Sequence, residues 1–167
     1  MRNIVLIGMP ACGKSTIGVM LAKFMGMDFL DSDILIQKTT GRTLPALIKE
    51  HGLEGFLDIE GRVNASIAPK EPTVIATGGS VIYREQAMEH LKSIGTVVYL
   101  YVGFKSLERR LHRLESRGVA IGEGMTLLDL YNERVPLYRK YADITVFEGR
   151  RRPAQIVHEL VDRLQEA

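Results

Sequence analysis

One eight-residue segment near the N-terminus narrows the possible folds more than any other part of this chain. It reads Gly8-Met9-Pro10-Ala11-Cys12-Gly13-Lys14-Ser15, which matches the pattern G-x-x-x-x-G-K-[ST]. In such a loop the backbone N–H groups wrap a polyphosphate, and glycine stands where a Cβ would block the approach. The loop works between a strand and a helix whose N-terminal dipole faces the phosphates. The segment therefore predicts a buried strand over 3–7, a nucleotide-binding loop, and a helix from Gly13 to Gly26.

Short apolar runs alternate with helical patterns along the rest of the chain. Further strands are predicted over 27–30, 74–76, 96–102 and 144–147. Helices are predicted over 33–40, 43–51, 53–67, 84–92, 106–115, 126–141 and 153–164. Strands separated by helices form βαβ units and a mostly parallel sheet. Because no linker or repeat interrupts the pattern, we expect one α/β domain over 1–167.

Charge and cysteine content argue against several classes of protein. The chain has 22 lysine and arginine residues against 20 aspartate and glutamate residues, so it lacks the strongly basic face typical of nucleic-acid binding. The N-terminal apolar run, 4–7, is too short for a signal sequence or a membrane span. Cys12 is the single cysteine, which excludes an intrachain disulfide. We expect a cytoplasmic protein that binds neither nucleic acid nor membrane, and a monomer because no heptad seam is present.

Two acidic residues, Asp31 and Asp33, follow the second predicted strand. Residues i and i+2 of a strand point to the same side, so one carboxylate can serve Mg²⁺ while the other faces an acceptor hydroxyl. Capping of the next helix by either residue is the alternative. The strand over 74–76 lacks the Asp-Glu pair of motor ATPases, and the chain lacks the N-K-x-D motif of GTPases. The pattern indicates transfer of the γ-phosphate of ATP to a small hydroxylated metabolite.

Further motifs, in order along the chain, resemble those of the shikimate kinase family. They are Leu30-Asp31-Ser32-Asp33, Thr40-Gly41-Arg42, Ile75-Ala76-Thr77-Gly78-Gly79, and Arg134-x-Pro136-Leu137-Tyr138 followed by Ala142-Asp143. The resemblance extends from about residue 2 to 165. It implies a P-loop NTPase three-layer sandwich, with a five-stranded parallel sheet, helices on both faces, a lid at about 116–125 and substrate-binding helices at about 33–67. It also implies conversion of shikimate to shikimate 3-phosphate with ATP and Mg²⁺, a step of aromatic amino acid biosynthesis.

The resemblance further assigns roles to individual residues. Those that bind ATP would be Gly8, Ala11, Cys12, Gly13, Lys14, Ser15, Thr16, Arg110, Arg117, Arg151 and Pro153. Those that bind the substrate would be Asp33, Leu57, Gly78, Gly79, Ser80 and Arg134. Ser15 and Asp31 would hold the magnesium ion. Three residues would be catalytic: Lys14 at the phosphates, Asp33 at the acceptor hydroxyl, and Arg117 of the lid at the phosphoryl group in transit. Arg109 is an alternative to Arg110 beside the adenine.

The chain departs from the family pattern at several positions. Ala11 and Ser80 stand where the family has glycines, and Gly118 follows Arg117 where the family has proline. Leu57 stands where the family has the arginine of Phe-Arg-x-x-Glu, which binds the substrate carboxylate. Loss of such a charged hydrogen bond costs about 2–4 kcal/mol unless another group replaces it.

These departures leave the acceptor open. Arg62, one turn beyond Asp58, and Ser80 are the candidates for remaking the pocket, while Glu60 is interpreted as a structural residue that holds Arg134 or a neighbour. Three alternatives follow: a kinase of another polyol, hydroxy acid or amino alcohol; a non-catalytic ATP-binding regulator; and a nucleotide or nucleoside kinase of similar build.

Overall fold

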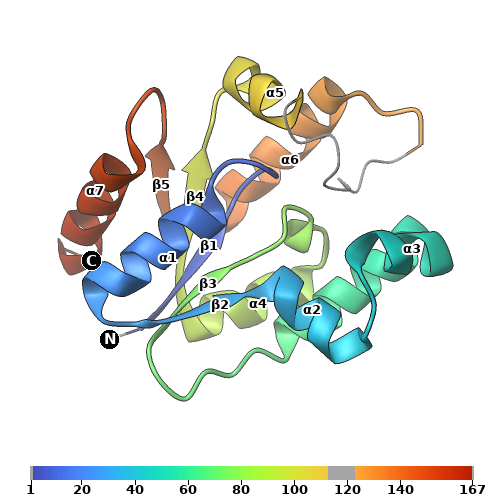
Figure 1. Cartoon of the computed structure of the whole chain (residues 1–167), viewed down its shortest axis with the longest axis horizontal. Coiled ribbons are helices and arrows are strands. Elements are labelled where there is room, and N and C mark those ends of the chain that lie inside the picture. Colours follow the sequence, from blue (N-terminus) through green and yellow to red (C-terminus); the bar gives the residue numbers. More distant parts are fainter. Residues whose placement is uncertain (1, 113–122, 167) are drawn as a thin grey trace.

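Parallel strands form the centre of the molecule, and helices cover both of their faces (Figure 1). In the computed structural model, residues 2–112 and 123–166 are described. The sheet has the order β2-β3-β1-β4-β5, and each pair is parallel. The strands are β1 Asn3–Ile7, β2 Asp28–Asp31, β3 Thr73–Ala76, β4 Gly95–Tyr101 and β5 Ile144–Phe147. This arrangement confirms the predicted five-stranded parallel sheet.

The strands are apolar because the sheet is covered on both sides. Val5, Leu6, Ile75, Val97 and Val98 have no measurable exposure. Continuous apolar runs of this kind are typical of parallel sheets sandwiched between helices. In the register, Leu6 lies beside Ala76 and Ala76 lies beside Asp31, so the carboxyl ends of β1, β2 and β3 are level. The loops that leave these three strands therefore emerge together.

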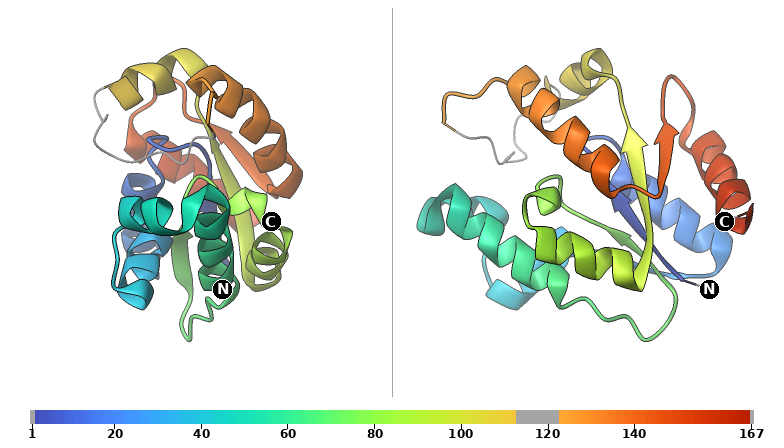
Figure 2. Two further views of the ribbon diagram at one scale, coloured as in Figure 1. Left: turned by 90° about the vertical axis from the view of Figure 1, so that its right-hand side faces the viewer. Right: turned by 180° about the vertical axis from the view of Figure 1, so that it is seen from behind.

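Two pairs of helices cover the two faces of the sheet (Figure 2). On one face α1 (Lys14–Met25) packs against α7 (Pro153–Glu166). On the other lie α4 (Glu85–Ile94) and α6 (Leu127–Tyr141), with α5 (Phe104–His112) against α6. A capping box between Thr126 and Asp129 starts α6.

The helices α2 (Ser32–Thr40) and α3 (Leu44–Ala65) pack on each other around their own apolar cluster, beyond the end of the sheet (Figure 1). The buried members of this cluster, which we call the α2–α3 cluster, are Ile36, Leu47, Phe56, Leu57 and Val63. The two helices predicted over 43–51 and 53–67 are one element with a kink at Gly52, where φ is 71° and ψ is 178°. A short 3₁₀ helix, η1 (Val81–Tyr83), follows β3 and was not predicted.

Most other predicted elements agree with the structure to within one or two residues at each end. Two predictions extend outside the described residues: the helix over 106–115, of which 113–115 are not described, and the lid at 116–125, of which 116–122, Arg117 included, are not described. No helix in the described ranges is long and apolar enough to span a bilayer.

Candidate active site

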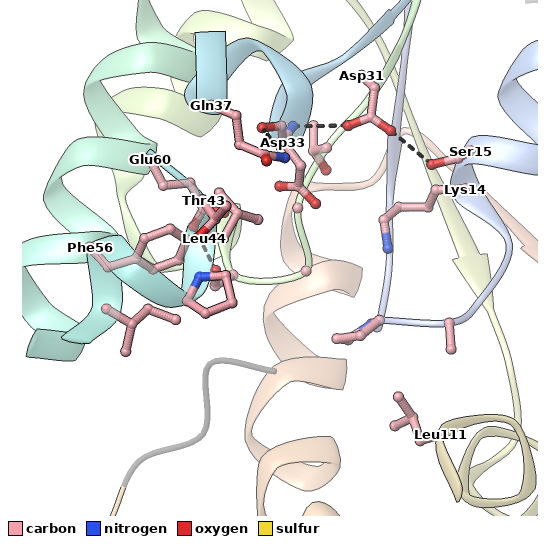
Figure 3. Close-up of a pocket in the computed structure, with 18 of the residues that line it drawn as sticks. Lys14, Ser15, Asp31, Asp33, Gln37, Thr43, Leu44, Phe56, Glu60 and Leu111 are labelled. Atoms are coloured by element: carbon pink, nitrogen blue, oxygen red, sulfur yellow. Dashed lines mark hydrogen bonds between the residues drawn. The ribbon is translucent and has the colours of Figure 1, made fainter. Parts of the chain in front are cut away.

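A cavity of about 570 Å³ opens where the carboxyl ends of β1, β2 and β3 meet (Figure 3). This is the place where ligands bind in sheets of this type, and the volume suits a small molecule. Its walls come from the P-loop, from the end of β2 and the start of α2, which carry Asp31 and Asp33, from the start and middle of α3, from the loop after β3, and from Leu111 and Arg134. Segments that are far apart in sequence thus contribute to one site.

The P-loop has the backbone that its glycines predict. At Gly8, φ is +150°, and a Cβ there would lie 2.8 Å from both Cys12 Sγ and Leu100 O. Gly13 is the N-cap of α1 with φ +94° and no side-chain cap, so the helix N-terminus is presented to the cavity without a competing side chain. Ala11 has φ +61°, the left-handed conformation, where the family has glycine. A Cβ in this conformation costs about 1–2 kcal/mol.

The side chains of Lys14 and Cys12 lie differently within this loop. Lys14 Nζ donates to Gly8 O at 2.8 Å and to Met9 O at 2.9 Å, and the residue lines the cavity. Cys12 is fully buried, with Sγ 3.6 Å from Lys14 Nζ, and is absent from the cavity wall. Cys12 therefore contributes backbone rather than its thiol to the phosphate loop.

Asp31 has two roles at once. Its Oδ2 accepts from Ser15 Oγ at 3.0 Å, and its Oδ1 accepts from the backbone N–H of Asp33 at 2.9 Å (Figure 3). The same Oδ1 also accepts from the backbone N–H of Ile34 at 3.3 Å. The predicted strand geometry of Asp31 and Asp33 is wrong, because β2 ends at Asp31 and α2 begins at Ser32. Asp33 instead lies in the first turn of α2, which still directs it into the cavity.

Ser15 and Asp31 fit a magnesium ion in chemical type. A hydroxyl and a carboxylate are hard oxygen donors, and Mg²⁺ is usually held by one or two such groups with substrate phosphates and water. No cluster of three or more histidine, cysteine or acidic side chains that could hold a metal alone occurs in 2–112 or 123–166. The hydroxyl of Ser15 and the carboxylate of Asp31 suit a magnesium ion whose other ligands are nucleotide phosphates and water.

The carboxylates of Glu60 and Asp33 both lie beside the backbone of Gly78. A Cβ at Gly78 would lie 2.5 Å from Glu60 Oε2 and 2.8 Å from Asp33 Oδ1, so both acids contact this backbone. The Gly78 N–H donates to the buried Ser32 Oγ at 3.3 Å, which ties the loop after β3 to α2. Ser80 Oγ donates to Glu60 Oε1 at 2.6 Å from within the cavity wall. Ser80 thus adds a hydroxyl to the pocket where the family has glycine.

Burial perturbs both acids of this group. It raises the pKa of Asp33, and the charge of Asp31 raises it further, while Lys14 lowers it. It also raises the pKa of Glu60 to about 7, with Asp33 adding to the effect and the Ser80 hydrogen bond and Arg134 opposing it. Titratable groups shifted toward neutral pH within a cavity are typical of functional sites.

Arg134 lines the cavity from α6, with only 1% of its surface exposed. Its NH1 would lie 3.0 Å from a Cβ at Gly79, so the guanidinium packs directly on that backbone. Its Nε donates to Tyr83 Oη at 3.2 Å. This placement suits the predicted contact with a substrate carboxylate.

Leu57 does not line the cavity, although Phe56 and Glu60 on the same helix do. Only 4% of Leu57 is exposed, and it packs in the α2–α3 cluster. Arg62 is exposed and is likewise absent from the cavity wall, so it does not replace the arginine that the family has at 57. Among the described residues, the cations that line the cavity are Lys14 and Arg134.

The residues expected beside the adenine lie around Glu148. Arg110 donates to both carboxylate oxygens of Glu148, at 2.9 and 3.1 Å, and to Ala11 O at 3.3 Å. Arg151 donates to Glu148 O at 3.4 Å and forms an ion pair with Glu159. Glu148, which directly follows β5, was missed by the sequence analysis. Its position at the carboxyl end of a strand was the signal that could have found it.

Arg109 and Pro153 are the other two residues predicted to lie beside the adenine, and both are exposed. Arg109 is exposed and bonds to Lys105 O and Ser106 Oγ of its own helix, so of the two arginines Arg110 is the one directed at the P-loop. Pro153 is exposed at the start of α7.

Comparison with known proteins agrees with this geometry. The family model described as shikimate kinase matches residues 10–165. The chain belongs to the shikimate kinase family. The shikimate kinase of Pseudomonas fluorescens (strain Pf0-1) is 37% identical over 166 residues, covering 98% of this chain and 96% of the relative. That of Methylococcus capsulatus is 34% identical over 168 residues, covering 99% and 94%.

Solved structures give the same result for this member of the shikimate kinase family. The structure of shikimate kinase from Acinetobacter baumannii in complex with shikimate has a TM-score of 0.90 and 33% identity, covering 99% of this chain and 94% of that one. A gluconokinase from Sinorhizobium meliloti 1021, at 21% identity and a TM-score of 0.56, shares the fold. Family and fold together make the protein an ATP-dependent kinase.

Proposed function

We propose that this protein transfers the γ-phosphate of ATP to the 3-hydroxyl of shikimate, forming shikimate 3-phosphate and ADP. The observation that carries the proposal is the shared cavity, where the P-loop, the Ser15–Asp31 pair, Asp33 and Arg134 all converge. One end has the groups that a nucleotide polyphosphate needs. The other end has Asp33, which can bind a hydroxyl, and Arg134, which can bind a carboxylate. Shikimate has both a hydroxyl and a carboxylate.

The nucleotide end works by positioning and charge neutralisation. Lys14 exchanges its bonds to the loop carbonyls for the β- and γ-phosphates, and the first N–H groups of α1 receive the phosphate oxygens. Ser15 and Asp31 would hold Mg²⁺, which supplies charge neutralisation at the phosphates. Arg110, fixed by Glu148, is the candidate at the adenine. Arg117, outside the described residues, stays a predicted contact of the phosphoryl group.

The acceptor end relies on Asp33. Its carboxylate orients the substrate hydroxyl and takes its proton as the new oxygen–phosphorus bond forms and the bond to the departing ADP oxygen breaks. The raised pKa of Asp33 moves it toward the range in which a general base works at neutral pH. Asp33→Asn is therefore expected to lose nearly all turnover while Lys14→Ala loses all of it, each measured by ADP release.

Leu57 favours a second candidate, an acceptor without shikimate's carboxylate geometry. Among the described residues, Arg134 is the one arginine that lines the cavity. A shikimate carboxylate there lacks the second charged partner that the family pattern provides. The missing bond corresponds to about 30- to 1000-fold in kcat/KM. Another polyol, hydroxy acid or amino alcohol is the alternative acceptor.

The test is ADP release with Mg·ATP, with and without shikimate, for wild type and Leu57→Arg. Val63→Arg is a matched control, because it introduces the same charge into the same cluster and helix, at a position outside the stretch that matches the family's Phe-Arg-x-x-Glu. Wild-type turnover at about 1–100 per second supports the proposal. Response of Leu57→Arg alone, or of neither protein while ATP still binds, refutes shikimate as the substrate and calls for a screen of hydroxylated metabolites.

We also expect a cytoplasmic monomer. Light scattering after size exclusion tests the oligomeric state, and a stable dimer at micromolar concentration would contradict it.

A further inference from the structure

Tyr83, which takes no part in the mechanism above, contacts Arg134 in two ways. Its Oη accepts a hydrogen bond from Arg134 Nε at 3.2 Å. Its ring also lies against the guanidinium, with Arg134 Cζ 5.3 Å from the ring centroid. The hydrogen bond fixes the direction in which Arg134 Nε–H points. The ring contact is a cation–π interaction, which stabilises the guanidinium beside the Tyr83 ring.

A third residue determines how the Tyr83 hydroxyl is oriented. Tyr83 Oη donates to Glu133 Oε1 at 2.6 Å. An arginine Nε can only donate and a carboxylate can only accept, so the single hydroxyl proton points to Glu133 and a lone pair points to Arg134. Burial and the bond to Glu133 raise the pKa of Tyr83, which keeps this proton in place at neutral pH. The chain from Glu133 through Tyr83 to Arg134 is therefore polarised in one direction.

The backbone of Tyr83 is also held firmly. The next residue, Arg84, donates from NH1 to Tyr83 O at 3.1 Å. The same guanidinium pairs with Asp58 at 2.9 Å and with Glu54 at 2.8 Å, both on α3. The tyrosine ring packs beside the α2–α3 cluster. The ring, the backbone and the hydroxyl of Tyr83 are thus each fixed by a different neighbour.

The orientation of Arg134 has particular weight in this chain. Leu57 supplies no charge to the cavity, so the alignment of one guanidinium with a two-oxygen partner determines how well a carboxylate is held. A planar fork gains two parallel hydrogen bonds only when its plane matches that of the carboxylate. Because Nε is directed at Tyr83, the guanidinium cannot rotate in its plane without losing that bond, and its terminal amino groups keep one orientation.

We propose that Tyr83 is a positioning residue for acceptor binding, which sets the plane of Arg134 so that it meets the carboxylate of the substrate. The inference rests on the proposed function, because it takes a carboxylate-bearing acceptor as the partner of Arg134. It adds a residue that does not line the cavity and that acts through Arg134.

The kinetic test compares Tyr83→Phe with wild type on shikimate and on shikimate methyl ester. The variant keeps the ring and removes the hydroxyl. We expect its KM for shikimate to rise by about 5- to 20-fold, its kcat and its KM for ATP to change by less than about twofold, and its effect on the ester to be less than about twofold. Tyr141→Phe is the matched control, because it removes a hydroxyl from a largely buried tyrosine on the same helix as Arg134, outside the cavity wall.

A second readout is independent of turnover. A buried Arg134 Nε–H that donates to Tyr83 should give a slowly exchanging ¹⁵N–¹H resonance, assigned by its loss in Arg134→Lys. Tyr83→Phe should shift this resonance and speed its exchange, whereas Tyr141→Phe should leave it in place. An unchanged resonance in Tyr83→Phe overturns the proposed contact whatever the substrate.

The outcomes separate this inference from the proposed function. Equal losses on shikimate and its ester, or a loss confined to kcat, would overturn the role of Tyr83 while leaving the enzyme a shikimate kinase. A wild-type protein without turnover on shikimate overturns the proposed function and, with it, the substrate-directed role of Tyr83.

Discussion

A methyl group added at Gly78 would occupy the point where two acidic side chains of the cavity meet. The ideal Cβ position lies 2.5 Å from Glu60 Oε2 and 2.8 Å from Asp33 Oδ1. Carbon–oxygen contacts normally begin near about 3.3 Å. The two carboxylate oxygens are therefore about 0.5 to 1 Å too close to the added methyl group of Gly78→Ala. Each must move away from it by about that distance.

The chain offers little room for that retreat. Glu60 is tied to Ser80 at 2.6 Å, and Gly78 itself is tied to Ser32 at 3.3 Å. A displacement of about 1 Å in a positioning group can cost about 100-fold in rate, so we expect a fall of that order in kcat. Overpacking of this kind costs about 1–3 kcal/mol of stability, which leaves the protein folded because side-chain ends rather than backbone must move.

The assay is ADP release with Mg·ATP and shikimate, accompanied by thermal unfolding. Gly103→Ala is the matched control, because a Cβ at Gly103 meets nothing within 4 Å and its φ is not positive. The control should keep wild-type activity. A Gly78→Ala enzyme with kcat within about threefold of wild type would show that Asp33 need not hold this position, and the reasoning would fail.

Three further changes test other parts of the site. Ala11→Gly should relieve the strain of the left-handed backbone at residue 11. After the entropy cost of glycine is subtracted, the free energy of unfolding should rise by about 0.5–1 kcal/mol, measured as a higher Tm. A lower Tm would contradict the strain. Burial raises the pKa of Glu60 from 4.5 to about 7, so its protonated form favours the folded state, and this contribution is complete below pH 4.5 and is lost as pH rises to about 7. Urea unfolding should therefore show wild type losing up to about 3 kcal/mol relative to Glu60→Gln between pH 4.5 and 8, and parallel pH profiles would refute this. Glu148→Gln should loosen Arg110 and raise the KM for ATP by about 3- to 10-fold with the KM for shikimate unchanged; an unchanged KM for ATP would count against Arg110 beside the adenine.

Local patterns predicted the parts of the structure that depend on local physics. The strand predicted over 144–147 agrees with β5 at both ends, because a buried parallel strand is a short apolar run that stands out between polar neighbours. The P-loop was predicted for a similar reason, since its glycines are required by backbone conformations at fixed spacing.

Contacts between distant segments left no such pattern. Arg134 and Tyr83 are 51 residues apart, and nothing in either segment indicates that a tyrosine of an unpredicted 3₁₀ helix would meet the arginine. Leu57 was recognised as a missing arginine, but its burial in the α2–α3 cluster depends on how α2 and α3 pack. The start of α2 at Ser32 placed Asp33 on a helix rather than a strand, because the side chain of Asp31 caps that helix.

The buried thiol of Cys12 can report when the P-loop opens. The sulfur has no exposed surface and sits against Gly8 and Lys14, so an alkylating reagent can reach it only after the loop departs from this conformation. When reclosing is faster than the chemical step, the labelling rate divided by the rate for a free thiol is the equilibrium constant for local opening. Nucleotide binding to the closed loop lowers that ratio by the factor 1 + [L]/Kd. Mass spectrometry of a single modification would thus measure loop dynamics and nucleotide affinity in the unmodified sequence, without an engineered probe and without turnover.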